Sequence, residues 1–207
     1  MAPKAAFVKE EPVRSPTIER YSQAAIILHW LIAVLITGNV LLALSLDYIA
    51  EAGRRPYIDF HKSIGITVLG LAALRLLWRL THRPPAMPAY APWERRAAHV
   101  AHWTLYFLIF AMPLTGWLHD SAWKGAATHP MKLFFTIPWF RLGFIQNLDP
   151  ATKEQLHSLF GTIHGDVLPY LLYAVFFAHV AGALKHQFLD GKPEFQRMWF
   201  QRRTNTQ

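Results

Sequence analysis

The feature that most constrains this chain is a run of 23 residues, Ala24 to Leu46, without a single Lys, Arg, Asp or Glu. About 20 apolar residues are enough for an α-helix to cross a bilayer. A helix buried in a soluble bundle usually keeps a polar stripe, and this run has none. We therefore expect the segment to span a membrane.

Three further segments complete a set of four spans. Residues 97–118 and 167–184 are also free of these charged side chains. The segment 63–80 is interrupted by Arg75 and Arg79, whose long side chains can reach the headgroups from near a helix end. The sequence thus predicts an all-α integral membrane protein, a four-transmembrane-helix bundle with helices at 24–46, 61–80, 97–118 and 158–186.

The rest of the chain is assigned to tails and connections. We expect a mobile cytoplasmic tail, one membrane domain and a second cytoplasmic tail, at 1–19, 20–200 and 201–207. Residues 81–95 form a Pro-rich linker. The connection 119–157 is too long for a simple turn. Its apolar stretch 134–145 is broken by Pro138, so we expect it to lie at the outer membrane interface rather than to form a fifth span.

The formal net charge of +8 is unevenly distributed, and this distribution indicates how the chain is oriented in the membrane. Of the 21 Lys and Arg residues, 14 fall in 1–23, 75–96 and 185–207, and 7 fall on the other side. This bias predicts that both termini are cytoplasmic. The basic balance suits anionic headgroups rather than nucleic acid. No removable signal peptide is expected, because the first apolar run is long enough to span.

The chain has no cysteine but eleven histidines. The absence of cysteine excludes disulfides, thiolate zinc sites, iron–sulfur clusters on thiolates and the attachment of c-type haem. The histidines therefore carry most of the information about function.

Four histidines fall at matching depths in the predicted helices. His29 and His179 lie near the cytoplasmic side, whereas His61, at the start of its helix, and His164 lie near the outer side. His164 and His179 are 15 residues apart, which is about 22 Å along a helix axis. Their directions differ by roughly 60°, so both can face one bundle interior.

An inner and an outer histidine pair suit two haems b, each held by two imidazoles between helices. Slots could be opened by Gly65, Gly161 and Gly182. A zinc site usually needs a tighter tetrahedral cluster. The alternative for each histidine is a packed core residue bonded to a neighbouring carbonyl.

Other polar residues have more than one role open to them. His157 is an alternative outer ligand to His164, and Asp166 and Pro169 flank the outer site. Lys62 could pair with a haem propionate, attract an anion or reach the headgroups. Residues that could contact a quinone or haem propionates, or simply headgroups, are Arg75, Arg79, Lys185, His186, His99 and His102. Residues expected at the surface are His82, His119 and His129. Thr37, Gly38 and Asn39 could serve a helix contact or a haem slot.

The motifs of the four helices resemble bacterial cytochrome b561 over roughly residues 20–200. RYSQAAIILHWLIAVLI at 20–36 and FHKSIGITVLGLAALRLLWRL at 60–80 are similar to the family's first and second helices. HVAHWTLYFLIFAMPLTGWL at 99–118 is similar to the third, and HVAGALKHQFLDGKPEFQRM at 179–198 to the end of the fourth.

The resemblance implies a dihaem membrane cytochrome in which His29 and His179 ligate the inner haem. His61 and a helix 4 histidine would ligate the outer haem. The helix 4 ligands of this family are usually about 14 residues apart, against 15 here. A local widening of the helix near Pro169 would reconcile the two spacings.

The resemblance also implies single-electron transfer between membrane ubiquinone and an outer-face donor, superoxide in one branch of the family. An outer basic funnel could attract superoxide, using Lys62, Lys124, Lys132 or Arg141. The alternatives are an electron-carrier subunit that docks a redox partner through the outer loop, and a histidine-lined metal or proton transporter. The interior has few acids and no inverted repeat, which argues against the transporter.

Overall fold

A computed structural model of the chain describes residues 18–200, so most of the two predicted tails lies outside the described residues. Four helical segments are long and apolar enough to cross a membrane, at Gln23–Tyr48, Glu51–Thr81, Pro92–Ala122 and Pro150–Leu189. The predicted fold of four spans is confirmed. Large apolar side chains on these spans, such as Val34 and Leu41, are more than 60% exposed, as expected for a lipid-facing surface.

The main helices are α1 (Gln23–Ser45), α2 (Arg54–Thr81), α3 (Pro92–Ala122), α5 (Pro150–Thr162) and α6 (Leu168–Leu184). Shorter elements are β1 (Lys132–Leu133), β2 (Ile137–Pro138), α4 (Gly143–Gln146) and α7 (Glu194–Arg197). Three 3₁₀ turns occupy Leu46–Tyr48, Glu51–Gly53 and Lys124–Ala127. The fourth span contains two π-helical segments, Ile163–Val167 after α5 and Lys185–Leu189 after α6.

Three predicted helix boundaries are wrong in the same direction. Helix α2 begins at Arg54 instead of 61, α3 covers 92–122 instead of 97–118, and the fourth span begins at 150 instead of 158. The predicted spans ended where charged residues begin, whereas the helices continue past the bilayer core into polar sequence. His61 is therefore well inside α2 rather than at its start.

Local capping explains two of these early starts. Asp149 precedes Pro150, and its carboxylate accepts hydrogen bonds from the backbone N–H groups of Ala151 and Thr152. Proline is favoured in the first turn of a helix, since its missing N–H would have no partner there. Helix α3 likewise begins at Pro92. The outer connection is consequently 123–149, shorter than the predicted 119–157.

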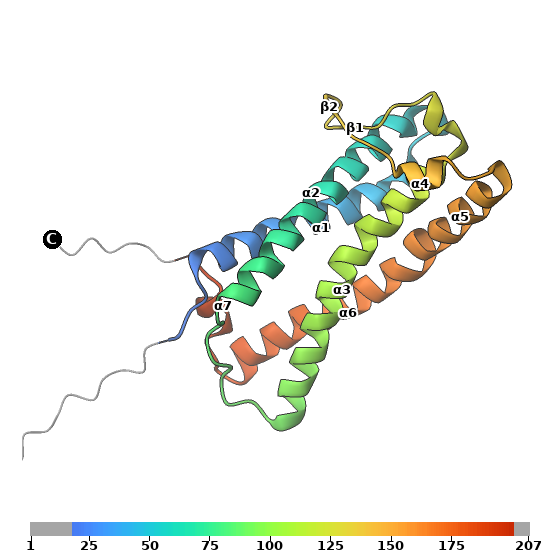
Figure 1. The fold of residues 1–207 in the computed structure, drawn as a ribbon. Helices are drawn as coiled ribbons and strands as arrows, with labels where there is room; N and C mark the ends of the chain where they lie inside the picture. Colours follow the sequence, from blue (N-terminus) through green and yellow to red (C-terminus); the bar gives the residue numbers. More distant parts are fainter. Residues whose placement is uncertain (1–17, 201–207) are drawn as a thin grey trace, which may run out of the picture.

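The spans pack as neighbours in sequence. Helix α1 packs along α2 through Ile32, Ile64 and Val68, and α3 packs against α6 through Leu108 and its partners there. Helix α2 also packs along α3. The start of α1 and the segment around α7 meet at one end of the bundle, and α4, the β-hairpin and the start of α5 lie at the other (Figure 1). We call these the inner and the outer end.

The predicted interface segment is folded at the outer end as a β-hairpin followed by α4. Leu133 packs on Ile66 of α2, and Phe134 N–H donates to Ser63 Oγ at 2.9 Å. Phe134 and Phe135 both have positive φ, which is costly for a bulky residue, and both remain exposed. No fifth spanning helix is found within residues 18–200.

A buried ion cluster fixes the outer connection to the helices. Asp120 in α3 is 4% exposed and lies 2.5 Å from Lys62 Nζ and 2.8 Å from Arg141 Nε. Arg141 Nη1 also donates to the carbonyl oxygens of Ala126 and His129. One carboxylate therefore neutralises cations from α2 and from the loop after β2.

Arg197 performs a similar role at the inner end. It is 5% exposed, and its guanidinium donates to the carbonyl oxygens of Glu19 and Ala86. The backbone N–H of Tyr21 donates to the Arg197 carbonyl at 3.1 Å. These bonds join the residues before the first span, the linker between the second and third spans, and the residues after the fourth span. A chain that crosses the membrane four times has these three segments on the same side.

Replacing Asp120 with Asn should destabilise the protein, because the buried Arg141 then loses its carboxylate partner and Lys62 is left with the longer contact to Asp59. We expect a loss of about 3 kcal/mol in unfolding free energy. Thermal unfolding in detergent measures it, with the exposed outer-end variant Glu154→Gln as the control. Equal midpoints for the two variants would contradict the role given to Asp120.

Candidate functional site

Two histidine pairs face each other across the interior, one near each end of the bundle. At the inner end, His29 of α1 and His179 of α6 have ring centroids 6.3 Å apart. At the outer end, His61 of α2 and His164 of the π-helical segment are 6.0 Å apart. The rings of each pair meet edge to face, at interplanar angles of 77° and 86°. The structure thus brings together the two pairs that the sequence suggested.

These separations fit a metal ion between two imidazoles. Each metal–nitrogen bond is about 2 Å long, so rings on opposite sides of one ion have their centres roughly 6 Å apart. Within residues 18–200, neither pair is joined by a third protein ligand into the kind of cluster that a tetrahedral zinc ion requires. Two imidazoles on opposite sides of an iron are the axial set of a b-type haem.

The π-helical segment sets the direction of His164. A π-helical turn accommodates one extra residue, so the 15-residue spacing between His164 and His179 can place both on the inward face. The expected local widening near Pro169 is confirmed, since Ile163–Val167 ends two residues before that proline. This widening brings the directions of the two histidines closer together than the roughly 60° of a regular helix.

His164 is held by the neighbouring helix α3. Its Nδ1 donates to the carbonyl oxygen of Met112 at 2.8 Å, and Nδ1 is also 3.2 Å from Thr115 Oγ1. This bond leaves Nε2 with the free lone pair that a metal needs. A methyl group at Gly116 would lie 2.9 Å from the ring, so a glycine at this position makes room for the imidazole.

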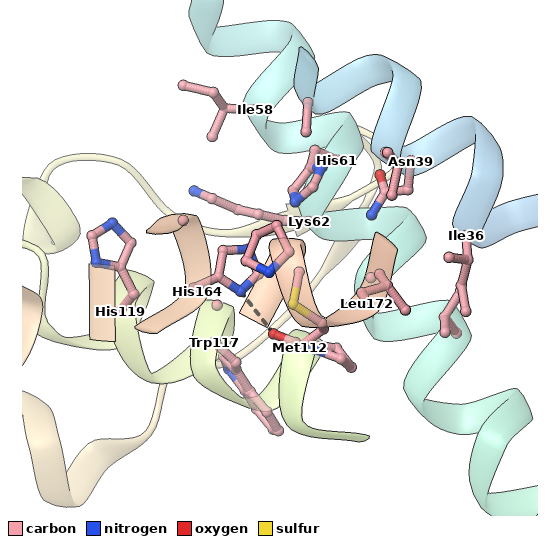
Figure 2. Close-up of a pocket in the computed structure, with 18 of the residues that line it drawn as sticks. Ile36, Asn39, Ile58, His61, Lys62, Met112, Trp117, His119, His164 and Leu172 are labelled. Carbon is pink, nitrogen blue, oxygen red and sulfur yellow. Dashed lines mark hydrogen bonds between the residues drawn. The ribbon is translucent and has the colours of Figure 1, made fainter. Parts of the chain in front are cut away.

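The outer pair lines a cavity of about 470 Å³ between α1, α2, α3 and the fourth span. Figure 2 shows His61 and His164 entering it from opposite sides, with Asn39 beside His61. Among residues 18–200, His61 Nδ1 and Asn39 Oδ1 have no hydrogen-bond partner, although both atoms are buried. A mainly apolar cavity with facing imidazoles and a few orphaned polar atoms fits a flat macrocycle that carries a metal.

The glycines that were expected to open haem slots have different surroundings. Gly65 lines the outer cavity, whereas Gly161 faces the ring of His119 and Gly182 has open space around it. A methyl group at Gly38 would also meet no atom within 4 Å, so this glycine makes no close helix contact, and Asn39 belongs to the cavity.

The alternative ligand His157 has a different partner. Its ring stacks on that of His119 with 3.9 Å between centroids, and each Nδ1 donates to the other residue's carbonyl oxygen. Stacked rings at this distance leave no room for an ion between them. The expectation that His119 lies at the surface of a connection is wrong, because it is half-buried within α3. His119 directly follows the predicted span 97–118, so extending that helix by one turn would have included it.

His102 adds a third imidazole at the inner end. Its centroid lies 5.1 Å from that of His179, and its Nδ1 is bonded to the Ala98 carbonyl at 2.6 Å. The sequence grouped His102 with the arginines of the inner end and gave no reason to place it against His179. His82 and His129 are exposed, as predicted.

The residues proposed for an outer basic funnel are mostly neutralised. Lys62 and Arg141 both bind Asp120, and Lys62 is also 3.4 Å from Asp59. Lys124 and Lys132 remain exposed on the connection. A role in attracting an anion is therefore left to Lys124 and Lys132, since Lys62 and Arg141 serve the buried ion cluster.

The inner cations divide into two groups. Arg75 and Arg79 line a cavity of about 650 Å³ at the end of α2, and Arg75 Nη1 donates to the Ala25 carbonyl. His186 lies in a separate cluster, 2.6 Å from Asp190 and against the ring of Tyr90. Hydrogen bonds from Lys185 and His186 hold the pKa of Asp190 below its usual value. His186 therefore does not join the two arginines in one pocket.

The comparisons with known proteins agree with this geometry. The family model of prokaryotic cytochrome b561 matches residues 20–201. Cytochrome b561 homolog 2 of Escherichia coli K12 is 31% identical over 189 residues, covering 88% of this chain and 92% of the relative. The probable superoxide oxidase CybB of Yersinia pestis is 32% identical over 175 residues, covering 83% and 90%. The chain belongs to the prokaryotic cytochrome b561 family and is a membrane-embedded b-type cytochrome that carries electrons.

Proposed function

We propose that this protein passes single electrons across a bacterial inner membrane, from superoxide at the outer face to ubiquinone near the inner face. Two haems b would do so, held by His61 with His164 and by His29 with His179. The observation that carries the proposal is that the rings within each pair have centroids only 6.0 and 6.3 Å apart, with the two pairs at different depths of the bundle.

Haem b between two axial imidazoles supplies reversible one-electron exchange without a change of ligands. The chain's own residues prepare the two sites. The Met112 carbonyl fixes the tautomer and direction of His164, and the apolar walls of the outer cavity exclude water. Asn39 offers an acceptor beside the second outer ring, His61.

The depth of the two pairs suits transfer across the bilayer. His164 and His179 are separated by 15 residues, or about 22 Å of helix. Each pair is therefore near one end of a hydrocarbon core that is about 30 Å thick. The charge bias favours the end with α7 as the cytoplasmic side, because 14 of the 21 Lys and Arg residues fall in the sequence segments 1–23, 75–96 and 185–207.

The overall reaction balances with one quinone for every two superoxide ions. Two superoxide ions each lose one electron and leave as O₂, and one ubiquinone takes up two electrons and two protons to become ubiquinol. Arg75 supplies a cation near the inner rings that can bind a quinone oxygen or a haem propionate, with Arg79 one turn further along α2. The name of the Yersinia relative supports superoxide as the donor.

A second candidate is an electron carrier that serves a redox protein at the outer face. The exposed aromatic side chains of the outer connection favour it, namely Phe134, Phe135, Phe140 and Phe144. The histidine-lined transporter has no such support, because the family is one of electron carriers.

Superoxide supplied to purified protein with a soluble ubiquinone analogue tests the proposal. We expect ubiquinol to form faster than without protein, at two superoxide ions per quinol, and the His179→Ala variant to lose the acceleration. Protein that is reduced by ubiquinol but unaffected by superoxide would reject the superoxide reaction and favour the carrier.

Removing one axial imidazole should remove one haem. His29→Ala or His179→Ala should reduce the haem content to about half of wild type and leave the outer site reducible. His164→Ala should remove the outer haem, whereas His157→Ala should keep both. Haem loss in His157→Ala but not in His164→Ala would show that the outer ligand has been misassigned.

Gly116→Ala should disturb the outer site alone, because the new methyl group meets the His164 ring at 2.9 Å. We expect a lower outer haem content or a shifted reduction potential for that haem. Gly70→Ala is the matched control, since its methyl group would meet no atom within 4 Å. Identical redox titrations of the two variants would argue against a His164 ligand.

A further inference from the structure

The inner end contains a second cavity whose lining is unusually rich in arginine. The cavity, about 650 Å³ in volume, lies between the start of α1, the end of α2 and the linker that follows. Four arginines from three segments line it: Arg20, Arg75, Arg79 and Arg83. The carboxylate among the lining residues is that of Glu19.

The positive charge of this cavity is not balanced by protein groups. Glu19 Oε2 accepts a hydrogen bond from the backbone N–H of Ala86 at 3.0 Å. Arg75 donates to the Ala25 carbonyl, which is uncharged. Among residues 18–200, Arg20, Arg79 and Arg83 form no ion pair.

Several cations elsewhere in the bundle have carboxylate partners. Lys62 and Arg141 share Asp120, and Lys185 binds Glu94 and Asp190. Gathering guanidinium groups in one cavity costs free energy unless an anion neutralises them. Guanidinium groups bind phosphate oxygens in a bidentate way, so phosphate is the anion that such a set favours.

The position and lining of the cavity indicate that the phosphate belongs to a lipid. It lies at the last turns of α2, where Trp78 donates its indole N–H to Ser22 Oγ at 2.9 Å. Tyr21 and Tyr106 also line it, and such aromatic side chains favour the headgroup level of a bilayer. Leu77 and Leu80 are 59% and 69% exposed on the same part of α2, where acyl chains can cover them.

We propose that this cavity binds the phosphate of an anionic phospholipid from the adjoining leaflet. Arg20 and Arg83 contact the phosphate oxygens, and the lipid's acyl chains run along α2. The ligand chemistry is a phosphate group, which free inorganic phosphate shares. The proposed redox function uses Arg75 and Arg79, so the lipid site is tested on Arg20 and Arg83, which that function does not use.

Thermal unfolding of delipidated protein in detergent tests the site. Phosphatidylglycerol in mixed micelles should raise the unfolding midpoint by about 5 °C, because a ligand that binds only the folded state stabilises it. Phosphatidylcholine at the same concentration should leave the midpoint unchanged. An equal shift from phosphatidylcholine would overturn the proposal, and a full shift from inorganic phosphate would assign the site to the free anion.

Paired variants locate the effect. The double variant Arg20→Gln, Arg83→Gln should lose the shift, whereas Arg95→Gln, Arg96→Gln, which removes two inner-end arginines outside the cavity, should keep it. Equal responses of the two double variants would overturn the assignment to this cavity. Unchanged haem spectra in both show that they fold and that the redox sites are not involved.

Native mass spectrometry gives a second readout that does not depend on stability. Wild-type protein released from the membrane should retain one phosphatidylglycerol molecule more often than the Arg20→Gln, Arg83→Gln variant does. Equal retention of this lipid by both proteins would contradict the proposal.

Discussion

The arrangement of this protein depends on four imidazole side chains that lie inside a membrane-spanning bundle and face one another in pairs. A polar ring in this position costs free energy unless it has a partner. The spans pack along the sequence, α1 with α2, α2 with α3 and α3 with α6, and Ile36 and Val40 of α1 also reach the cluster around Leu168. The histidine pairs add a further link between the first two spans and the fourth. A metal between the rings of each pair would join the two halves of the bundle.

The fourth span shows how local structure serves this pairing. In a regular α-helix the directions of His164 and His179 would differ by roughly 60°, and the π-helical segment Ile163–Val167 reduces this difference by absorbing one extra residue. Helix α3 then supplies both the carbonyl of Met112 and the space beside Gly116. Three separate features of the backbone therefore act on one imidazole.

Much of this arrangement could be predicted from the sequence, because uncharged runs reveal spans and matching depths reveal partners. Both histidine pairs were accessible in this way, whereas the widening before Pro169 followed from the resemblance, because the family's usual helix 4 spacing is one residue shorter. The helix ends were not, because a helix continues into polar sequence beyond the lipid, as α2 does from Arg54. The partners of Lys62 and the stacking of His119 on His157 depend on tertiary packing that no local pattern encodes.

Charge is organised differently at the two ends of the bundle. At the outer end Asp120 neutralises the cations of α2 and the connection, whereas at the inner end four arginines share a cavity with a single carboxylate. The central claim, however, concerns the histidines, and a haem count on detergent-purified protein tests it most directly. Pyridine haemochrome analysis with a protein determination should give two haems b per chain. A value of one would mean that one histidine pair is not a haem site, and a colourless protein would contradict the account as a whole.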